Sequence, residues 1–293
     1  MVKTLRVVAL SLLITGLMTG CVKEKLDILT NQVFNNSKES QENESITWGA
    51  ERKGSLFIDS TVFKEEDPYK RVPYNHEMIT IPAGNYLMGS PFGFENIQPL
   101  HKVTINAFRL GRYEVTQKQW RDVMDKLPSE SKKCDDCPVG HVSWEDVQDF
   151  IYRLNQKTWG KPYRLPSESE WEYACRSGGE VQTYCGGESF NNLGWHNQNS
   201  SGRARPVGGK NPNRLGLYDM SGNVFEMVED CYFDSYVGAP TNGVARTDNF
   251  CSEKVARGGS FFSSLFYLRS ASRGVVNRSD QVDFVGFRLA QDH

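Results

Sequence analysis

The residues whose types could do chemistry are concentrated in two segments marked by glycine, Leu215 to Asp230 (LGLYDMSGNVFEMVED) and Val255 to Phe262 (VARGGSFF). The first segment joins a turn rich in oxygen ligands to an aromatic and carboxylate cluster, and the second contains a Gly-Gly turn. This combination indicates a binding or catalytic site. No cysteine follows Cys251, so no thiolate stands downstream of the second segment, which limits the reactions that such a site could support.

The histidines and the hydroxyl nucleophiles indicate no second site. A 2-His-1-carboxylate iron centre needs two imidazoles that converge. His76 precedes the expected domain, His293 ends the chain and His141 opens a helix, while His101 and His196 could meet only through folding. The sequence therefore supports no iron site. Because no nucleophile elbow is recognisable either, we assign no catalytic residue.

The N-terminus predicts export and a lipid anchor. Lys3 and Arg6 precede an apolar run that ends at Met18, which is typical of a secretory signal peptide over residues 1–20. The following TGC resembles the processing site of bacterial lipoproteins, at which Cys21 becomes the lipidated first residue; a simple signal peptide with a chance cysteine is the alternative. Val22 after this cysteine favours the outer membrane. We expect a periplasmic protein that contacts the membrane only through its N-terminal lipid.

Composition separates a tether from a folded domain and narrows the range of partners. The net charge of the 293 residues is -2, so we expect no nucleic-acid partner and no electrostatic binding to an acidic membrane. Residues 21–76 are rich in Asn, Ser, Glu and Lys, which predicts a flexible, lipid-anchored tether. The folded domain is expected over residues 77–293.

The remaining six cysteines predict a disulfide framework, because an exported chain enters an oxidising compartment. Pairing between sequence neighbours is the most economical arrangement, although other connectivities are allowed. The expected pairs are Cys134 with Cys137, Cys175 with Cys185, and Cys231 with Cys251. Zinc binding by the first pair would need a second pair at ligand spacing, and none is close in sequence. Redox activity of the first pair stays open as an alternative.

Three amphipathic helices are predicted in the first half of the domain. Thr116 with Gln119 and Ser167 with Glu170 have the spacing of capping boxes, and Ser143 can cap the helix between them. The expected helices run from Thr116 to Leu127, from Ser143 to Leu154 and from Ser167 to Cys175. Trp144, Trp171 and Tyr173 lie on their faces and are expected in the core.

Strand signals flank these helices. Residues 78–90 and 101–115 carry strand-forming residues interrupted by Gly and Pro, and the chain ends in a strand-like FVGFRLA. After Cys175 turns dominate. Strands, then a few helices, then a long turn-rich half indicate an α+β domain with little regular structure.

Seven blocks of sequence resemble the formylglycine-generating enzyme family, also called the sulfatase-modifying-factor family. In order they are MITIPAGNYLMGS, YEVTQKQW, HVSWEDVQDFI, YRLPSESEWEYACR, GLYDMSGNVFEM, RGGSF and VGFRLA, and they span about Glu77 to Ala290. The resemblance implies a C-type-lectin-like variant fold. It does not fix one reaction, because members include copper oxidases that form formylglycine, relatives of iron-dependent enzymes, and proteins of siderophore maturation or secretion-linked signalling.

The resemblance also points to positions at which a copper centre would be built. In the copper oxidases, two cysteines downstream of the Gly-Gly-Ser turn bind Cu(I), which suits soft thiolate ligands. Here Ser263 occupies the first position and the second falls near Leu265. A hydroxyl and an alkane cannot replace two thiolates, so copper is not expected. Ser263 could instead form a polar cleft floor, or simply satisfy the backbone of its loop.

Calcium is the cofactor that the resemblance favours. In the family one Ca²⁺ is held by the segment that matches Asp219, Gly222, Val224 and Glu226. Calcium takes six to eight oxygens, and a tight glycine turn can offer carboxylates together with backbone carbonyls. A turn held by hydrogen bonds alone is the alternative. The loop of the family's second calcium site is shortened here, and we assign no ion to it.

The same comparison suggests a ligand cleft beside the Gly-Gly turn. Phe225 stands where the family usually has Trp, so the wall of the pocket is reshaped. The candidate cleft residues are Phe225, Glu226, Arg257, Ser260, Ser263, Arg269 and Arg273. Its arginines, with Arg278, could clamp a carboxylate or phosphate. The alternative is that they pair with Glu226, Glu229 or Asp283.

Three functions remain open from the sequence. The first is a lipid-anchored binding or regulatory module without the copper cysteines, which presents its cleft to an envelope protein or a small ligand. The second is an oxidoreductase of the same family that modifies an exported protein or siderophore precursor without paired cysteines. The third is a true formylglycine-generating oxidase.

Overall fold

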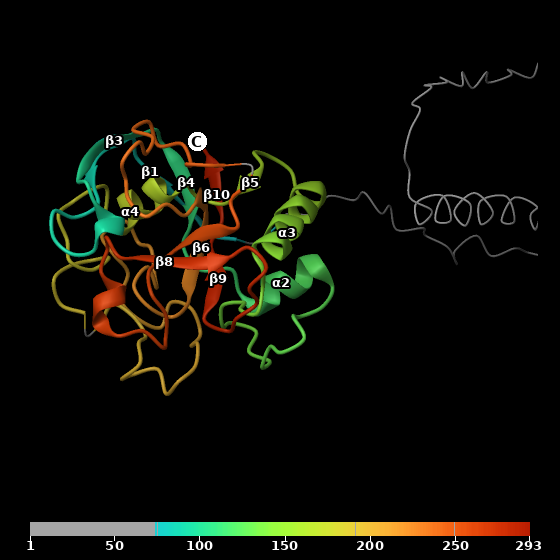
Figure 1. Ribbon diagram of the computed structural model, residues 1–293. Coiled ribbons are helices and arrows are strands. Elements are labelled where there is room, and N and C mark those ends of the chain that lie inside the picture. The colour runs from blue at the N-terminus through green and yellow to red at the C-terminus, as the bar shows by residue number, and fades with distance from the viewer. Residues whose placement is uncertain (1–73, 75, 191, 249) are drawn as a thin grey trace, which may run out of the picture. The chain divides into compact units, whose positions relative to one another are not determined.

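The computed structural model describes residue 74 and residues 76–190, 192–248 and 250–293. The predicted signal peptide, Cys21 and nearly all of the predicted tether lie outside these residues. The described residues form an α+β domain in which short strands and helices are joined by long turns (Figure 1). The fold class expected from the sequence is therefore confirmed, while the lectin-like comparison stays a prediction.

The first sheet joins both ends of the described chain. Its four strands are β1 (Met78–Ile81), β4 (Phe108–Gly111), β10 (Ala290–Asp292) and β5 (Tyr163–Arg164), in that order and all antiparallel. The C-terminal strand β10 lies between β4 and β5, so it completes the sheet (Figure 1). A separate pair, β2 (Gly84–Met88) and β3 (His101–Ile105), is also antiparallel.

The second four-stranded sheet carries the candidate site. Its order is β8 (Arg273–Asn277), β7 (Glu253–Arg257), β6 (Phe225–Cys231) and β9 (Val285–Phe287), with β6 and β9 parallel. The expected terminal strand FVGFRLA is thus two strands, because β9 pairs with β6 whereas β10 pairs with β4. Arg288 lies at this crossover between the two sheets, where its guanidinium is buried.

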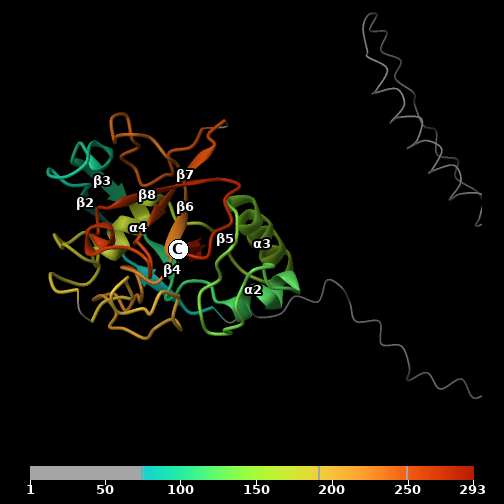
Figure 2. The same cartoon turned by 60° about the horizontal axis from the view of Figure 1, so that its bottom comes forward.

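The three predicted helices are present as α2 (Gln117–Met124), α3 (Trp144–Lys157) and α4 (Glu168–Cys175), and each begins with a complete capping box. The first helix ends three residues before the expected Leu127, because Asp125 adopts a left-handed conformation with φ 64°. Helices α2 and α3 lie side by side on one flank of the domain, whereas α4 lies among the strands (Figure 2).

Aromatic packing joins the helical flank to the sheets. The Trp120 ring stacks on Phe150 with centroids 5.1 Å apart, and Phe287 meets Phe150 edge-on at 5.3 Å. Trp171 and Tyr173 are buried as predicted. Trp144 is only half-buried; the Lys254 ammonium lies 4.1 Å from its ring centroid.

The folded part begins slightly earlier than the sequence suggested. We expected residues through His76 to belong to the tether, but His76 is buried and its Nδ1 lies 3.0 Å from Nε2 of Gln119. Burial lowers the pKa of His76 to about 4. Tyr74 packs edge-on against Tyr163 at 5.9 Å. Both residues therefore belong to the domain.

Candidate functional site

The two glycine-marked segments meet in space. The amide of Gly222 donates to the carbonyl of Gly258 at 2.9 Å. Both glycines have positive φ, 97° and 89°. A Cβ at Gly222 would lie 2.2 Å from the carbonyl oxygen of Trp195, so only glycine fits this contact. These contacts support the prediction from the sequence that the two segments lie together at one site.

The serines of the Gly-Gly-Ser turn are occupied with one another. The Ser263 hydroxyl accepts from the Ser260 amide at 3.0 Å, and the Ser263 amide donates to the Ser260 carbonyl at 2.9 Å. Both residues are buried. This geometry matches the alternative in which Ser263 satisfies its own loop. Leu265, at the second copper position, is partly exposed and begins the short helix η2 (Leu265–Leu268).

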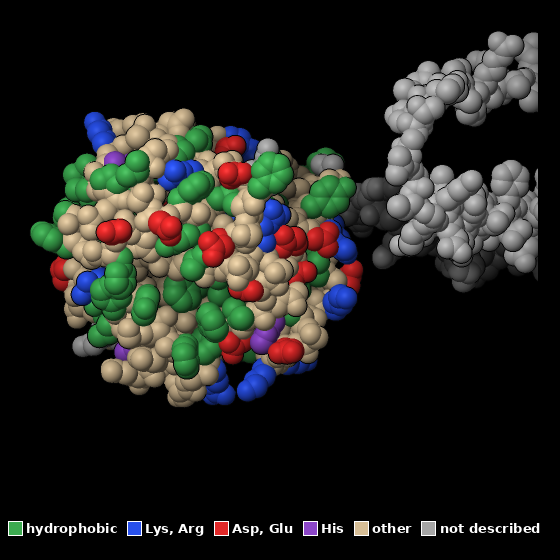
Figure 3. Space-filling view, viewed as in Figure 1, with side chains coloured by type: hydrophobic (Ala, Val, Ile, Leu, Met, Phe, Trp, Pro, Cys, Tyr) green, Lys and Arg blue, Asp and Glu red, His purple; other side chains and the backbone are tan. Residues whose placement is uncertain are grey.

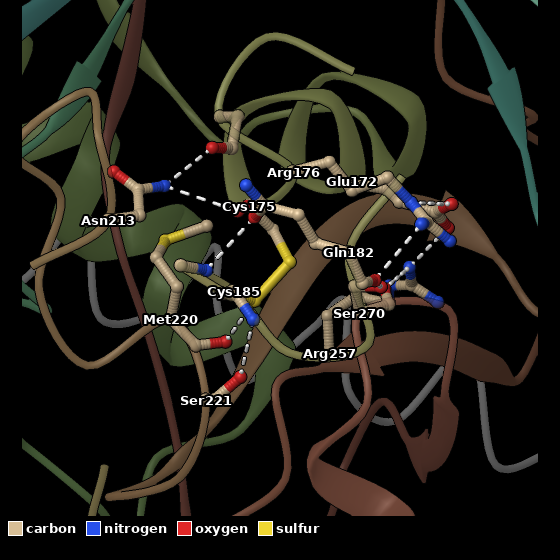
Figure 4. Close-up of a disulfide and its surroundings, with 12 residues drawn as sticks. Glu172, Cys175, Arg176, Gln182, Cys185, Asn213, Met220, Ser221, Arg257 and Ser270 are labelled. Atoms are coloured by element: carbon tan, nitrogen blue, oxygen red, sulfur yellow. Dashed lines mark hydrogen bonds and ion pairs between the residues drawn. A yellow bond between two sulfur atoms is a disulfide. The ribbon is translucent and has the colours of Figure 1, made fainter. Parts of the chain in front are cut away.

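A copper-thiolate centre does not fit these residues. Ser263 and Leu265 supply no sulfur, and the six cysteines in the described part of the chain are all paired in disulfides. The pairs are the neighbours that the sequence predicted. Cys175 and Cys185, in the interior, fix the end of α4 beside Ser221 and the carbonyl of Met220 (Figure 4).

Below the Gly-Gly turn lies a layer of buried charge. Arg288 donates to both carboxylate oxygens of Glu226 at 2.5 Å, and the Trp171 indole N–H donates to Glu226 Oε2 at 2.6 Å. All three side chains are buried. Glu226 therefore has both oxygens engaged by the protein itself.

Helix α4 supplies the other acids of this layer. Glu172 accepts from Arg257 at 2.5 Å and from Arg176 at 2.9 Å (Figure 4). Glu168 pairs with Arg273 at 2.7 Å. Burial alone would raise the pKa of Glu168, but the two arginines Arg273 and Arg257 hold it below its ordinary value. The sequence analysis missed these glutamates. The available signal was the placement of acids at alternate positions of a predicted helix, which the structure shows to be buried on every side.

The arginines therefore pair with acids of the protein itself, which was the alternative to clamping a ligand, but the acids are not the expected ones. We expected Glu226, Glu229 or Asp283, whereas Arg257 and Arg273 use the glutamates of α4, and Arg278 pairs with Glu145 at 2.9 Å. Only Arg269 among the cleft candidates is an exposed cation, and its guanidinium lies 4.9 Å from the Phe266 ring centroid.

The remaining candidates do not line an open cleft in this structure. Glu226, Arg257, Ser260 and Arg273 are brought together, but they are buried. Phe225 is half-buried against Gly274. A ligand would therefore meet the surface above this layer rather than the charged groups themselves.

The predicted calcium segment holds further buried carboxylates. Asp219 Oδ2 accepts from the Gly208 amide at 2.7 Å, and Oδ1 is buried without a hydrogen-bond partner among the described residues. Glu114, which the sequence analysis missed, accepts from Asn223 Nδ2 at 2.6 Å and from the Val224 amide at 3.1 Å. Burial raises the pKa of Asp219 to about 6, and burial together with the charge of Asp219 raises that of Glu114.

These residues fit calcium in part. The orphaned Oδ1 of Asp219 is a free oxygen ligand in a region of excess negative charge. The Glu226 carboxylate is committed to Arg288 and Trp171, and within the described residues no group of three or more His, Cys, Asp or Glu side chains is placed to hold a metal. The ligand set Asp219, Gly222, Val224 and Glu226 stays a prediction.

Above the turn the surface changes character. A group of apolar side chains, which we call the η2 surface, lies here. Four of its members are exposed and Phe266 is half-buried among them; the exposed members are Phe94, Phe262, Leu265 and Tyr267. Phe262 is 72% exposed and Tyr267 46%, and the rings of Phe94 and Phe266 are 5.1 Å apart. Figure 3 shows hydrophobic side chains gathered on the lower left of the viewed face, where the red-orange turn lies in Figure 1.

Buried polar groups hold this surface in place. Arg257 donates to the carbonyls of Ser270, Ala271 and Ser272 at 2.8 to 3.1 Å, directly after η2. The Ser221 hydroxyl donates to the Leu268 carbonyl at 2.9 Å. The charged layer therefore positions the backbone that carries the exposed aromatic rings.

No helix in the part of the chain that the structure describes has the length and apolar character needed to span a bilayer. The lipid anchor expected at Cys21 lies outside that part.

Comparison with known proteins places these features in a family. The chain is 29% identical over 214 residues to the chaperone protein LppX of Paenibacillus barcinonensis, which covers 56% of this chain and 72% of that protein. It is 26% identical to the formylglycine-generating enzyme of Bos taurus, covering 74% and 75% of the two chains. The structure of PvdO from Pseudomonas aeruginosa superposes with a TM-score of 0.67 at 31% identity, covering 74% of this chain and 95% of PvdO.

A family model described as the sulfatase-modifying factor enzyme 1-like domain matches residues 64–293. The match includes the interlocked glycine turns, the charged layer and the η2 surface. The chain therefore belongs to the sulfatase-modifying factor enzyme 1-like domain family.

Proposed function

We propose that this chain is a lipid-anchored envelope protein that binds apolar segments of other polypeptides through its η2 surface. The observation that carries the proposal is the exposure of Phe262, Leu265 and Tyr267 at the position where the family's copper oxidases hold a copper-thiolate centre. Exposed apolar patches on a soluble domain mark interaction sites.

The chemistry of the surface favours a protein partner. Aromatic side chains bury a large apolar area with few rotatable bonds, and they are enriched at protein interfaces. Arg269 beside Phe266 adds a cation that can pair with a carboxylate at the rim. A relative that is named a chaperone supports this direction, because a chaperone acts on other polypeptides. The three disulfides suit an oxidising compartment outside the cytoplasm.

The residues at the Gly-Gly-Ser turn reduce the range of oxidoreductase reactions that this chain could catalyse. A formylglycine-generating reaction that depends on two thiolates at the turn has no sulfur at Ser263 or Leu265. An oxidoreductase that modifies an exported protein or siderophore precursor by another route remains the second candidate. The likeness to formylglycine-generating enzymes favours it.

The proposal is tested by suppression of aggregation. The full chain is mixed with a chemically denatured test protein at the moment of dilution, and light scattering is followed. We expect the wild-type chain to lower scattering and the F262S/Y267S double variant to lose most of this effect. The matched control is Tyr152→Ser, which removes an exposed aromatic ring from α3.

Two results would count against the proposal. The first is equal suppression by the double variant and the wild-type chain. The second is turnover of a sulfatase-derived cysteine peptide to formylglycine by the copper-loaded chain, which would favour the enzymatic alternative instead.

A further inference from the structure

A cavity of about 510 Å³ lies beside the first disulfide, and the proposed function does not use it. Both Cys134 and Cys137 line the cavity. Its charged lining consists of Lys132, Lys133, Arg203 and Arg205 against Glu130 and Asp283. Four positive and two negative side chains leave a net charge of +2 with His141 neutral, so the cavity favours anionic ligands.

This disulfide differs from the one in the core. Cys175 and Cys185 are buried, whereas Cys134 is partly exposed and Cys137 is 5% exposed. Cys134 and Cys137 are three residues apart, compared with 10 and 20 for the other pairs. A cross-link that closes so short a loop restricts the unfolded chain least. The bond is therefore reachable from solvent and is the least needed for folding.

The loop around this disulfide is held independently of the sulfur-sulfur bond. The amide of Gln117 donates to the Cys137 carbonyl at 2.9 Å, and the Cys134 amide donates to Gln117 Oε1 at 3.0 Å. Arg121 donates to both carboxylate oxygens of Asp135 at 3.0 Å. These bonds attach the loop to α2, so the two sulfurs stay close to each other when they are reduced.

We propose that the Cys134–Cys137 disulfide is a thiol-disulfide exchange site for acidic polypeptides that contain a pair of cysteines. The C-x-x-C spacing suits such chemistry when a positive environment stabilises the thiolate. Lys132 and Lys133 directly precede the partly exposed Cys134 and line the same cavity, and Arg121 offsets the charge of Asp135. The other acid of the loop, Asp136, is exposed to solvent.

The exchange balances without another reagent. A substrate thiolate attacks Sγ of Cys134, and a new sulfur-sulfur bond forms while the Cys134–Cys137 bond breaks and its electron pair leaves on Cys137. A second substrate thiolate then attacks the substrate sulfur of this mixed disulfide and releases Cys134. The substrate dithiol loses two electrons and two protons, and the pair of cysteines gains them. A further disulfide restores the starting state by the same exchange.

The first experiment compares the three disulfides within the intact full chain. The chain is equilibrated with graded dithiothreitol, alkylated, and mapped by peptide mass spectrometry. We expect the Cys134–Cys137 peptide to be half reduced at a reductant concentration about tenfold lower than the Cys175–Cys185 peptide. The circular dichroism spectrum should not change at that concentration. Reduction of all pairs together, or only with loss of structure, would overturn the proposal.

The second experiment identifies the attacked sulfur and the role of charge. The Cys137→Ser variant leaves a thiol at Cys134, and it is mixed with a cysteine peptide supplied as its symmetric disulfide. The Cys134 thiolate takes one half of the peptide disulfide while the other half leaves as a free thiolate, and the mixed disulfide is quantified on the tryptic fragment that carries Cys134. We expect an acidic cysteine peptide to react roughly tenfold faster than a basic one at low salt, and K132E/K133E to remove this preference. The matched variant is Cys134→Ser, which should react slowly because Cys137 is buried.

Equal rates for the acidic and basic peptides, or faster reaction of Cys134→Ser, would contradict the assignment. The outcome is independent of the η2 surface. The F262S/Y267S variant should keep full exchange activity, and K132E/K133E should keep full suppression of aggregation.

Discussion

Two regions meet at the Gly258–Gly259 turn and distribute their side chains in opposite ways. Below the turn, charged groups are buried: Glu172, Arg257 and Arg288 have no measurable exposure. Above it, Phe262 and Tyr267 are open to solvent. A typical domain buries its apolar groups and exposes its charges. Here both tendencies are reversed: charged groups are buried on one side of the turn, and aromatic rings are exposed on the other.

The difference between the two regions indicates that each has a separate role. A buried ion pair gains little stability over an apolar pair, because desolvation offsets the attraction, but its geometry is specific. The contacts of Arg257 with three successive carbonyls show that specificity, since they fix the chain directly after η2. We infer that the buried layer serves as a rigid base and the η2 surface as the part that meets a partner.

The largest expected effect tests the buried layer. Glu172→Gln removes the charge that faces Arg257 and Arg176, and leaves a buried guanidinium without its closest counter-charge. Breaking a buried pair by removing one partner costs about 3 to 5 kcal/mol. We expect a loss of that size in the free energy of unfolding, measured with urea.

The control for this variant is the exposed pair of Arg278 with Glu145. Glu145→Gln should change stability by less than about 1 kcal/mol, because exposed ion pairs contribute little. If both substitutions have the same small effect, the buried layer is not the rigid base, and the comparison between the two regions fails.

Calcium binding would show whether the buried layer also holds a metal ion. Three carboxyl groups, those of Glu114, Asp219 and Glu226, are balanced by Arg288 and, at Asp219, by Lys210, so a divalent cation would neutralise the remaining negative charge. If calcium binds, a concentration 100 times its Kd should stabilise the chain by about 2.7 kcal/mol. Calorimetry and thermal unfolding with CaCl₂ or EDTA measure this.

Asp219→Ala is the matched variant, because it removes the orphaned Oδ1. It should abolish the response to calcium. An unchanged melting temperature in EDTA, together with no heat of binding, would leave the turn held by hydrogen bonds alone.

A pH prediction follows from another buried acid below the turn. Burial and the nearby Glu168 raise the pKa of Asp230 from 3.8 to about 7. The folded chain therefore keeps this proton up to about pH 7, whereas the unfolded chain releases it near pH 4. Stability contributed by Asp230 is present at low pH and is lost as pH rises toward 7, by roughly 1.6 kcal/mol between pH 5.5 and pH 7.

Asp230→Asn should flatten this dependence, as measured by urea unfolding at several pH values. The exposed Asp234→Asn should leave the slope unchanged. Stability that rises between pH 5.5 and pH 7 in the wild-type chain but not in Asp230→Asn would give the opposite sign and contradict the raised pKa.

Local features of this fold could be predicted from the sequence. Thr116, Ser143 and Ser167 cap their helices because a capping box needs only residues three positions apart. The neighbour pairing of cysteines is also confirmed. The family likeness placed the two glycine turns together, and the contact of Gly222 with Gly258 agrees with it.

The partners of the charged groups could not be predicted, because they are distant in sequence. Glu172 and Arg257 are 85 positions apart, and Glu168 and Arg273 are 105. No local sequence period links such positions, so the predicted acidic partners of the arginines were wrong. The exposure of Phe262 was missed for a related reason: an apolar residue in a turn has no face that periodicity can assign.

The smallest expected effect on stability tests the η2 surface. Phe262→Ser and Tyr267→Ser remove rings that are largely open to solvent, so each should change the free energy of unfolding by less than about 0.5 kcal/mol. The same substitutions should weaken binding of denatured protein, because the lost area is contact area. Urea unfolding of each variant beside its aggregation assay separates the two effects. A loss of stability comparable with that of Glu172→Gln would show that these rings belong to the core, and the contrast across the turn would then be one of degree rather than of role.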